Sequence, residues 1–327
     1  MATSLSNFGS EEKPFVYISV LNWNKADNTI RCLESLETLD YPNHRILVVD
    51  NASVDDSVER IRAAFPNIEI IRSTDNLGYA AGNLLALKRM LEDGAELFWI
   101  LNNDTTVESD TLTTLVEAYQ RHGPGLYGSV PIDTETETIG VSAWAIGAGN
   151  RPKYRQEQVV PWGASYSDFF VDKNECMAAN VSGSSLLIPR SIVKTYGFMD
   201  LSFFLYGEDV DYCFRLLRQG ILSYVVPRSV IKHTLRGSSS DNDRLLSVIY
   251  YYKVRNSLLV IKRYRGISAF LKYAGQLSVQ HLRQQLALSK NQRRLILRSP
   301  DRRYQWRAIW HATIGRTGKT IAPEDFV

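Results

Sequence analysis

In Leu97-Phe98-Trp99-Ile100-Leu101-Asn102-Asn103-Asp104, an unbroken apolar run passes directly into three polar side chains. Such a run is typical of a strand buried on both faces, as in a parallel sheet. Two other segments have the same form, because residues 15–21 lead into Asn22 and residues 46–49 lead into Asp50. Open α/β sheets bind ligands beside the carboxyl ends of such strands. We therefore expect Asp50 and Asp104 to meet in one crevice, although 54 positions separate them.

The segments between these strands carry helical patterns. Apolar residues recur at helical spacing over residues 25–39, and we also expect helices over 55–65 and 109–121, a short strand at 68–71, and a helix that is opened by a turn over residues 75–83 and ends at about 92. Alternation of strand and helix implies parallel strands joined by right-handed crossovers. The sequence therefore predicts an α/β fold with a mostly parallel, Rossmann-like central sheet and flanking helices.

The later part of the chain is less regular. Residues 123–180 are rich in Gly, Thr and aromatic side chains and would hold short strands and a variable loop. Strands are expected at 184–188 and at 222–226, the second ending at Pro227, and helices over 245–264 and 267–297. We divide the chain into a tail over residues 1–13 that is expected to be disordered, an α/β domain over 14–243 with halves 14–121 and 122–243, and a basic helical segment over 244–327.

The composition is ordinary for a soluble globular protein, with 44% hydrophobic and 22% charged residues. The net charge of +3 hides an asymmetry, because residues 250–327 hold 16 Lys and Arg against 3 Asp and Glu, whereas residues 1–249 hold 22 against 32. The 3 cysteines form no C-x-x-C pair, which favours reduced thiols in a cytosolic protein over a disulfide framework or a zinc site. No apolar signal core and no stretch of about 18 uncharged apolar residues is present, so no membrane-spanning helix is expected.

Polar side chains at the strand ends suggest ligand chemistry. A carboxylate such as Asp104 can hold a divalent cation against a pyrophosphate, because Mg²⁺ and Mn²⁺ are commonly bound by one or two carboxylates plus substrate phosphates. Asp50 can accept hydrogen bonds from a base or a ribose hydroxyl. Local structure is the alternative in both cases: an Asx-type turn at Asn102-Asn103-Asp104, and a helix N-terminal acid at Asp50.

Small residues and a helix start are combined in residues 76–83. Gly78 would let the backbone approach a nucleotide closely, and a helix N-terminus beside phosphates is electrostatically favourable. Asn76, Gly78 and Asn83 are therefore candidate nucleotide ligands, with a simple tight turn as the alternative. The segment is not G-x-G-x-x-G, so a dinucleotide-binding fold is not supported.

Three carboxylates open the helix expected after Tyr206. Asp211 and Arg215 have the spacing of a surface pair, which leaves Glu208 and Asp209 before the first turn. A base that takes a proton from a sugar hydroxyl must be ionised beforehand, and a helix N-terminus helps to keep it so. Charge complementarity to the helix dipole alone is the alternative.

Two further features have both a functional and a structural interpretation. His233 follows a strand and precedes a Gly/Ser-rich loop containing Arg236, so it could be a ligand or a lid anchor, although a lone His is usually structural. Aromatic residues between positions 144 and 170, including Trp162 and Tyr166, offer an acceptor surface, although packing around an irregular loop would also explain them.

Together, the ordered motifs of residues 14–240 resemble the inverting glycosyltransferases of family 2, which have the GT-A fold. That family has a nucleotide-binding Asp at a strand end, an Asn-x-Gly turn, a D-x-D metal motif, a Glu-Asp pair that carries the base, and a downstream His. The resemblance implies that Asp104 and His233 hold Mg²⁺ or Mn²⁺, and that Asp209 is the base beside Glu208. It also implies that Asp50 contacts the nucleobase and Asn102 lies near the ribose. The candidate nucleotide-sugar ligands are Asn22, Asp50, Asn76, Gly78, Asn83, Asn102, Asn103 and Arg236.

One departure from the family pattern bears on the donor. The first Asp of D-x-D is Asn102 here, so the site carries less negative charge and its cation depends more on the donor pyrophosphate. A similar Asn-Asn-Asp segment occurs in rhamnosyltransferase-like bacterial members, which favours dTDP-L-rhamnose, with a UDP-sugar next. The implied reaction is a single in-line displacement with inversion, in which Asp209 deprotonates a hydroxyl of a glycan or polyprenyl-linked acceptor in polysaccharide or cell-envelope synthesis. Residues 14–121 would bind the nucleotide, and residues 122–243 would hold the catalytic and acceptor sites.

The basic C-terminal segment, with Trp306 and Trp310 among its cations, is typical of a helix that lies on an anionic membrane. A solvated helical face packed on the catalytic domain is the alternative. Nucleic acid is not an expected partner, because no recognition motif accompanies the charge and the acidic body would repel a phosphate backbone. We expect a cytoplasmic enzyme, peripheral on the inner face of the membrane.

Two other functions compete with a glycosyltransferase. A nucleotidyltransferase would need a Gly-rich, Lys- or Arg-bearing loop after the first strand, where this chain has Asn22-Trp23-Asn24-Lys25. A non-catalytic nucleotide-sugar-binding or scaffold protein is left open by Asn102, whereas Asp104 and the Glu208-Asp209 pair argue against it.

Overall fold

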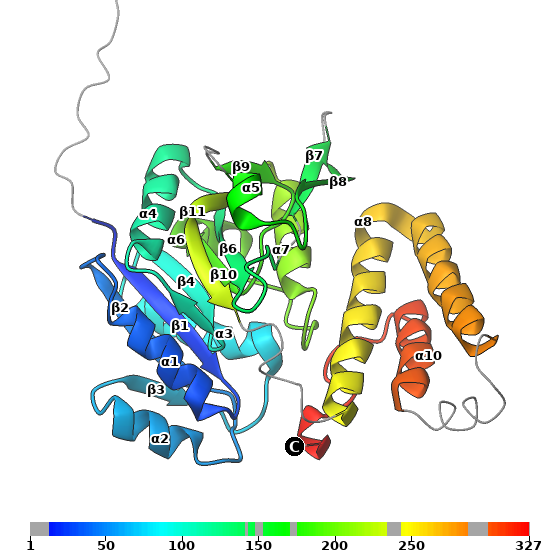
Figure 1. The fold of residues 1–327 in the computed structure, drawn as a ribbon, viewed down its shortest axis with the longest axis horizontal. Helices are drawn as coiled ribbons and strands as arrows, with labels where there is room; N and C mark the ends of the chain where they lie inside the picture. The colour runs from blue at the N-terminus through cyan, green and yellow to red at the C-terminus, as the bar shows by residue number, and fades with distance from the viewer. Residues whose placement is uncertain are drawn as a thin grey trace, which may run out of the picture.

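The computed structural model describes residues 13–140, 143–147, 153–170, 175–233, 243–286 and 300–326. The tail that was expected to be disordered therefore lies outside the described residues, apart from Lys13. A mixed sheet with helices on both sides forms the larger part of the molecule, and two C-terminal helices, α8 and α10, stand beside it (Figure 1).

Four parallel strands, in the order β3-β2-β1-β4, form the N-terminal half of the sheet. In this register Asn22 lies opposite Asp50, and Leu21 lies opposite Asn102, so the three strand ends meet as the sequence predicts. The α/β class is confirmed. The elements are β1 (Val16–Asn22), α1 (Ala26–Leu36), β2 (His44–Asp50), α2 (Ser57–Ala64), β3 (Glu69–Arg72), α3 (Gly78–Glu92), β4 (Leu97–Asn102), β5 (Thr105–Val107) and α4 (Thr111–His122).

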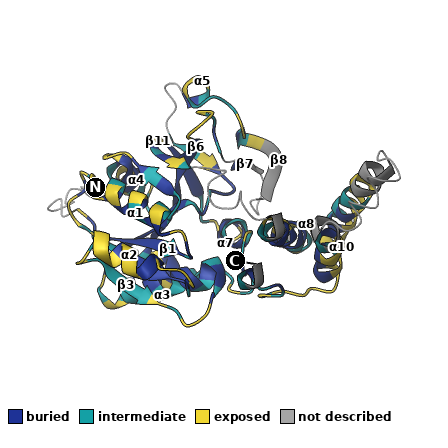
Figure 2. Cartoon of the chain, turned by 60° about the horizontal axis from the view of Figure 1, so that its bottom comes forward, coloured by how far each residue is buried: buried dark blue, intermediate teal, exposed yellow. Residues whose placement is uncertain are grey.

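The apolar runs of these strands are continuous because both faces of the sheet are covered. Phe98 and Ile100 of β4 pack into the core on one face, and Leu97, Trp99 and Leu101 pack into the core on the other. Burial on both faces favours apolar residues at every strand position. The strands are accordingly buried, whereas the outer faces of α1 and α2 are exposed (Figure 2).

The second half of the sheet is mixed. Strand β10 runs antiparallel to both β4 and β6, β11 runs parallel to β6, and β5 and β9 pair with β11 in antiparallel fashion. A separate antiparallel pair consists of β7 and β8. The elements are β6 (Leu126–Asp133), β7 (Ala143–Gly147), β8 (Lys153–Val160), α5 (Tyr166–Phe170), β9 (Cys176–Ala178), β10 (Ser185–Pro189), α6 (Arg190–Tyr196), α7 (Glu208–Leu217) and β11 (Ser223–His233).

One expectation for this half was incomplete and another was wrong. Residues 126–133 form a buried central strand, which the sequence disguises because Gly128 and Pro131 interrupt its apolar run. Gly128 is required there, since a Cβ would lie 2.7 Å from Cβ of Val181. Strand β11 also continues past Pro227 to His233, with a register shift between Val226 and Val230 that accommodates the proline.

The C-terminal part consists of α8 (Asp243–Leu286), which packs against α10 (Pro300–Thr313), followed by a short 3₁₀ helix, η1 (Pro323–Phe326). The expected break between two helices is present within α8 at Gly266, whose φ is 84°. Helix α10 was not expected, and the end of the helix expected over 267–297 falls beyond the described residues. No described helix has a stretch long and apolar enough to cross a bilayer.

Candidate active site

A cavity of about 270 Å³ opens at the carboxyl ends of β1, β2 and β4. Its polar side comes from the strand ends and the turn before α3, and its apolar side comes largely from the loop before α7 and from the start of α8. The polar lining residues are Asn24, Lys25, Asn28, Asn51, Asn76, Asn102, Asn103 and Asp104, and the apolar ones include Leu21, Trp23, Phe204, Leu205, Leu245, Val248, Ile249 and Pro323.

Asn22 and Asp50 lie behind the cavity wall. Asp50 is fully buried, where its Oδ1 accepts a hydrogen bond of 3.0 Å from Asn22 Nδ2 and its Oδ2 accepts one of 3.3 Å from the backbone of Ser53. Arg72 Nε lies 3.5 Å from Asp50 Oδ2. These contacts fix the loop that follows β2, so the adjacent Asn51, and not Asp50, lines the cavity.

The turn at residues 76–78 is held from two sides. Asn51 Oδ1 accepts a hydrogen bond of 3.0 Å from the backbone of Leu77, and the backbone of Tyr79 donates one of 2.9 Å to the carbonyl of Phe204. Gly78 has a φ of +78°, and a Cβ on it would lie 2.0 Å from that same carbonyl oxygen. The turn therefore needs glycine both for its backbone angle and for close packing.

Asn83, predicted as a ligand, is a core residue and does not line the cavity. Its Oδ1 accepts a hydrogen bond of 2.9 Å from Ser19, and its Nδ2 donates one of 3.0 Å to the carbonyl of Tyr79. These bonds tie the first turn of α3 to Ser19 of β1. The asparagine thus contributes to the shape of the site from the core.

Asp104 and His233 are brought together from distant parts of the chain. Strand β11 pairs with β5 so that His233 lies opposite Thr105, and His233 Nε2 is 3.1 Å from Asp104 Oδ1. Within the described ranges, Asp104 Oδ1 is buried with no partner other than this imidazole, and His233 Nδ1 is buried without a hydrogen-bond partner.

A divalent cation fits the Asp104–His233 pair. A carboxylate oxygen and an imidazole nitrogen converge there, and Mg²⁺ and Mn²⁺ commonly take only one or two carboxylates from the protein, with substrate phosphates completing the shell. No group of three or more acidic, His or Cys side chains suited to a metal occurs among the described residues. The protein therefore offers a partial shell that a diphosphate could complete.

Glu208 and Asp209 stand at the start of α7. The backbone N–H groups of Gly183 and Val210 donate to the two oxygens of Asp209, at 2.9 and 2.8 Å. Burial raises the pKa of both carboxyls, and the charge of Asp209 adds to the effect on Glu208, whose pKa lies well above its ordinary value. Two backbone N–H donors favour the ionised form of Asp209, whereas Glu208 Oε2 is buried without a hydrogen-bond partner in the described chain, so Asp209 is the carboxyl that ionises more readily.

Tyr79 connects this carboxylate pair to the cavity. It lines the cavity, and its hydroxyl donates a hydrogen bond of 2.5 Å to the carbonyl of Gly183, the residue whose N–H binds Asp209. Burial raises the pKa of Tyr79 well above its ordinary value, and the charges of Glu208, Asp209 and Asp104 add to this effect. The phenol therefore stays protonated between the two acidic positions.

Residues 17–169 match the family model described as Glycosyl transferase family 2. They form a family 2 glycosyl transferase domain. An N-acetylglucosaminyl-diphospho-decaprenol L-rhamnosyltransferase of Mycobacterium tuberculosis is 26% identical over 204 residues, covering 58% of this chain and 66% of that protein, just under two thirds of its length. The dTDP-rhamnosyl transferase RfbF of Shigella flexneri is 21% identical over 254 residues, covering 76% of this chain and 80% of that protein.

Solved structures show the same fold. The mannosyltransferase PcManGT from Pyrobaculum calidifontis, in complex with GDP-Man and Mn²⁺, superposes with a TM-score of 0.57 at 15% identity, covering 94% of this chain and 88% of that one. GalNAc-T7 with UDP, GalNAc and Mn²⁺ gives a TM-score of 0.55 at 14% identity, covering 77% and 48%. The GT-A fold predicted for this chain is confirmed.

The two predicted acceptor ligands of this family 2 domain do not line the cavity. Trp162 is 59% exposed and does not line it. Tyr166 donates a hydrogen bond of 2.9 Å to the carbonyl of Pro227 and packs against Phe170, so packing accounts for it. Arg236 falls outside the described residues.

Sequence reasoning overlooked several lining residues. Trp23 lines the cavity directly after β1, and its indole N–H is buried without a hydrogen-bond partner within the described chain. Its place at the cavity could have been inferred from sequence, because it directly follows the strand that ends at Asn22. The contributions of Val248 and Pro323 could not have been inferred, because they depend on how the C-terminal segment folds back.

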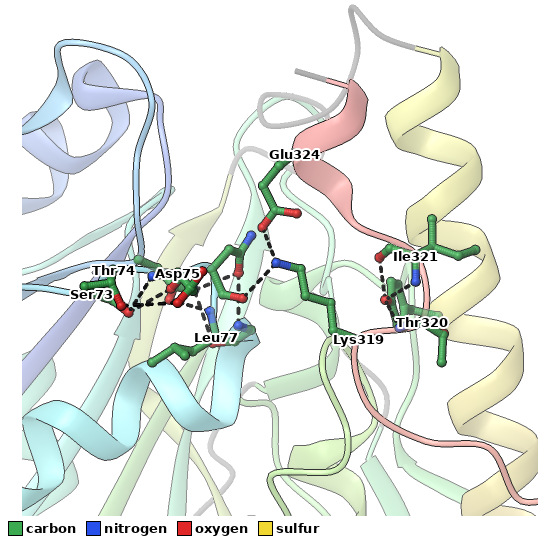
Figure 3. A network of polar contacts seen from close by, with 12 residues as sticks. Ser73, Thr74, Asp75, Leu77, Lys319, Thr320, Ile321 and Glu324 are labelled. Atoms are coloured by element: carbon green, nitrogen blue, oxygen red, sulfur yellow. Dashed lines mark hydrogen bonds and ion pairs between the residues drawn. The ribbon is translucent and has the colours of Figure 1, made fainter.

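That return of the chain is visible at the turn before α3. Lys319 reaches from the segment after α10 to the turn, where its Nζ donates a hydrogen bond of 3.2 Å to the carbonyl of Asn76, and it also pairs with Glu324 at 2.6 Å (Figure 3). The C-terminal segment is therefore attached directly to the candidate nucleotide-binding turn.

The surface pair predicted between Asp211 and Arg215 is wrong. Asp211 is fully buried and accepts hydrogen bonds from Arg263 (2.7 Å) and Tyr264 (3.0 Å) of α8, whereas Arg215 donates to the carbonyls of Tyr196 and Phe198, both at 2.5 Å. An exposed pair of this spacing is worth only a few tenths of a kcal/mol, about 0.2–0.5, so these tertiary partners prevail.

Proposed function

We propose that the protein is an inverting glycosyltransferase that moves a sugar from a nucleoside diphosphate donor to an acceptor hydroxyl. The observation that carries this proposal is a cavity lined by one member of a partial cation shell, Asp104, and linked through hydrogen bonds to a candidate base, Asp209. Asp104 and His233 lie 3.1 Å apart, and Tyr79 connects the cavity to Asp209 through Gly183. A family 2 domain with the GT-A fold supports the same reaction class.

The candidate residues divide the chemistry among them. Asp209 takes the proton from the acceptor hydroxyl, which attacks the anomeric carbon from the face opposite the nucleotide. Burial and the charge of Asp209 raise the pKa of Glu208, which favours Asp209 as the carboxylate that carries the charge. Asp104 and His233 hold Mg²⁺ or Mn²⁺, which stabilises the negative charge that develops on the departing diphosphate.

The donor we favour is dTDP-L-rhamnose, with a UDP-sugar next. Support comes from the Asn102-Asn103-Asp104 segment and from two relatives whose names specify rhamnosyl transfer. The acceptor is a glycan or polyprenyl-linked sugar, in keeping with the mycobacterial relative, whose name specifies a diphospho-decaprenol acceptor. Asn24, Asn76 and Asn102 would bind the nucleoside and the sugar through their amides, whereas Asn51 uses its amide to hold the turn at residues 76–78.

We also propose that the C-terminal helices rest on an anionic membrane surface. Trp306 and Trp310 of α10 and Ile314 just beyond it recur every four residues and are 43%, 61% and 52% exposed. Ile267 and Leu271 of α8 have the same spacing and are 57% and 61% exposed. With 16 Lys and Arg against 3 Asp and Glu in residues 250–327, charge complementarity selects anionic lipid as the partner.

The cytoplasmic face of the membrane is the proposed location. The three cysteines are free thiols, two of them buried, which suits a reducing compartment. Membrane contact there would bring a lipid-linked acceptor to the cavity whose wall α8 helps to form.

The test is transfer by the wild type and by Asp209→Asn. We expect the wild type to transfer sugar from one nucleotide sugar in the presence of Mn²⁺ or Mg²⁺, and Asp209→Asn to lose at least about 100-fold in turnover, because general base catalysis contributes about 10²–10⁴-fold. The variant should still show a nucleotide-dependent rise in melting temperature. A scaffold protein would show no transfer and no effect of the substitution.

A further inference from the structure

We propose that Arg255 and Asn256 of α8 are positioning residues that hold the loop carrying Glu208 and Asp209. The inference rests on the proposed function, since it concerns the placement of the candidate base. Neither residue lines the cavity, so they act through the loop and not on the substrate.

Asn256 uses its whole side chain on this loop and on Arg255. It is fully buried, and its Nδ2 donates to the carbonyls of Leu205 (2.8 Å) and Tyr206 (2.6 Å), while its Oδ1 accepts from Arg255 Nε (2.8 Å). Two donors and one acceptor are satisfied at once. No apolar residue of similar size could make these bonds.

The loop needs such support because its backbone is strained. Tyr206 has a φ of 65° and Gly207 a φ of 90°, both in the left-handed region, immediately before Glu208 begins α7. A non-glycine residue stays in that region only where its surroundings hold it. Asn256 binds the carbonyl of Tyr206 itself, so it supports the strained residue that directs the chain into the base-bearing helix.

Burial of the Arg255 guanidinium is expected to lower the stability of the fold. It is fully buried, and no carboxylate of the described chain lies within ion-pair distance of it. Its Nη1 donates to the carbonyl of Gly318 (2.8 Å) and to Thr320 Oγ1 (2.9 Å), and its guanidinium lies over the ring of Tyr252 at 4.8 Å. A buried cation without a counter-ion is expensive, which favours a role in fixing geometry.

The segment that Arg255 grips also reaches the other half of the site. The backbone of Gly318 donates to the carbonyl of Ser202 (2.7 Å), and Lys319 donates to the carbonyl of Asn76 (Figure 3). Next to that turn, the backbone N–H of Tyr79 donates a hydrogen bond to the carbonyl of Phe204 in the base-bearing loop. A closed path of hydrogen bonds thus joins the loop, α8, the C-terminal segment and the candidate nucleotide-binding turn.

Replacing Asn256 should loosen the loop without detaching α7. Arg263 and Tyr264 of α8 still bind Asp211 of α7 in such a variant. In Asn256→Ala we therefore expect a folded protein whose base is misplaced, with kcat lowered about 10- to 100-fold and donor KM within about twofold of wild type, because a displacement of about 1 Å can cost 10²-fold in rate.

Tyr251→Phe is the matched control. Tyr251 lies on the same helix and is fully buried, and its hydroxyl bonds to His311 Nδ1 (2.5 Å) and Thr320 Oγ1 (2.6 Å) without contacting the base-bearing loop. Arg255→Lys is the conservative variant, which keeps the charge but loses the fork that binds Asn256 and the C-terminal segment together. It should lie between Asn256→Ala and wild type in kcat.

The experiment combines steady-state kinetics with hydrogen exchange on the full chain. Loss of kcat at unchanged KM, with faster exchange of a peptide over residues 203–209, in Asn256→Ala but not in Tyr251→Phe, supports the proposal. A kcat within twofold of wild type, or an equal loss in both variants, or unchanged exchange, overturns it. If wild type transfers no sugar while Asn256→Ala still speeds exchange over 203–209, the proposed function fails and the positioning of the loop stands.

Discussion

Gly78→Ala should be distinctly more destabilising than a second glycine substitution made at the same backbone angle. Gly78 and Gly220 have φ values of +78° and +82°, so alanine at either position pays for a left-handed backbone, about 1–2 kcal/mol. The surroundings differ, because a Cβ at Gly78 would lie 2.0 Å from the Phe204 carbonyl oxygen, whereas one at Gly220 would meet nothing within 4 Å.

The close contact at Gly78 cannot be relieved cheaply. Its partner is a backbone oxygen that already accepts a hydrogen bond of 2.9 Å from Tyr79, so the loop or the turn must move. Overpacking of this kind costs about 1–3 kcal/mol, which gives an expected total of about 2–5 kcal/mol for Gly78→Ala against about 1–2 for Gly220→Ala.

Urea unfolding of both variants measures the difference directly, with the nucleotide-induced rise in melting temperature as a functional readout. We expect Gly78→Ala to lose that rise, because the turn that it distorts lines the cavity, and Gly220→Ala to keep it. Equal destabilisation by the two variants would show that the packing of the turn against residue 204 is unimportant, and would refute the reasoning.

The other predictions concern chemistry, charge and location. Asp209→Asn should lower turnover by at least about 100-fold and retain nucleotide binding, as measured by product formation and thermal shift. Because the pKa of Glu208 is raised on folding, the folded state binds a proton more tightly than the unfolded chain does. Stability should therefore fall as pH rises from the ordinary carboxyl range through the raised pKa. Glu208→Gln should remove that fall, so its melting temperature should exceed that of wild type more at pH 8 than at pH 5. Trp310→Ala should weaken co-sedimentation with vesicles containing anionic lipid, whereas Trp162→Ala, a similarly exposed tryptophan outside α10, should not; equal loss in both would contradict the membrane proposal. Asp104→Asn should make the thermal shift by dTDP insensitive to Mn²⁺, and a shift that stays fully Mn²⁺-dependent would count against the cation site.

Much of the fold of the N-terminal half could be predicted from sequence, because its strands are buried on both faces and are therefore apolar at every position. In β4, Phe98 and Trp99 point to opposite cores, so a run without alternation indicates a strand covered on both sides. The meeting of Asn22, Asp50 and Asn102 then follows from parallel topology alone. The same reasoning failed for β6, where Gly128 serves a contact with Val181 that no local pattern encodes.

The motifs of the candidate site could be predicted from sequence, whereas the residues that the C-terminal segment adds to the cavity could not. His233 reaches Asp104 because β11 passes Pro227 and pairs with β5, a continuation that the proline concealed. The contacts of Arg255 and Asn256 lie about fifty residues or more away in sequence and involve backbone carbonyls, which carry no side-chain signature. Helical periodicity shows that such a helix is partly buried, but not what it touches.

The charges around the cavity bear on how donor and cation would bind. Its polar wall consists mainly of asparagine amides, and Lys25, which is exposed, is the only Lys or Arg that lines it within the described chain. A diphosphate brought beside Asp104 would therefore meet a carboxylate with little fixed positive charge to offset it. A divalent cation reverses that balance, and the Asp104–His233 pair alone is too sparse a shell to hold one firmly. Each ligand supplies what the other lacks, so the geometry favours mutual dependence: the affinity for nucleotide should rise with the cation, and the affinity for the cation should rise by the same factor with the nucleotide.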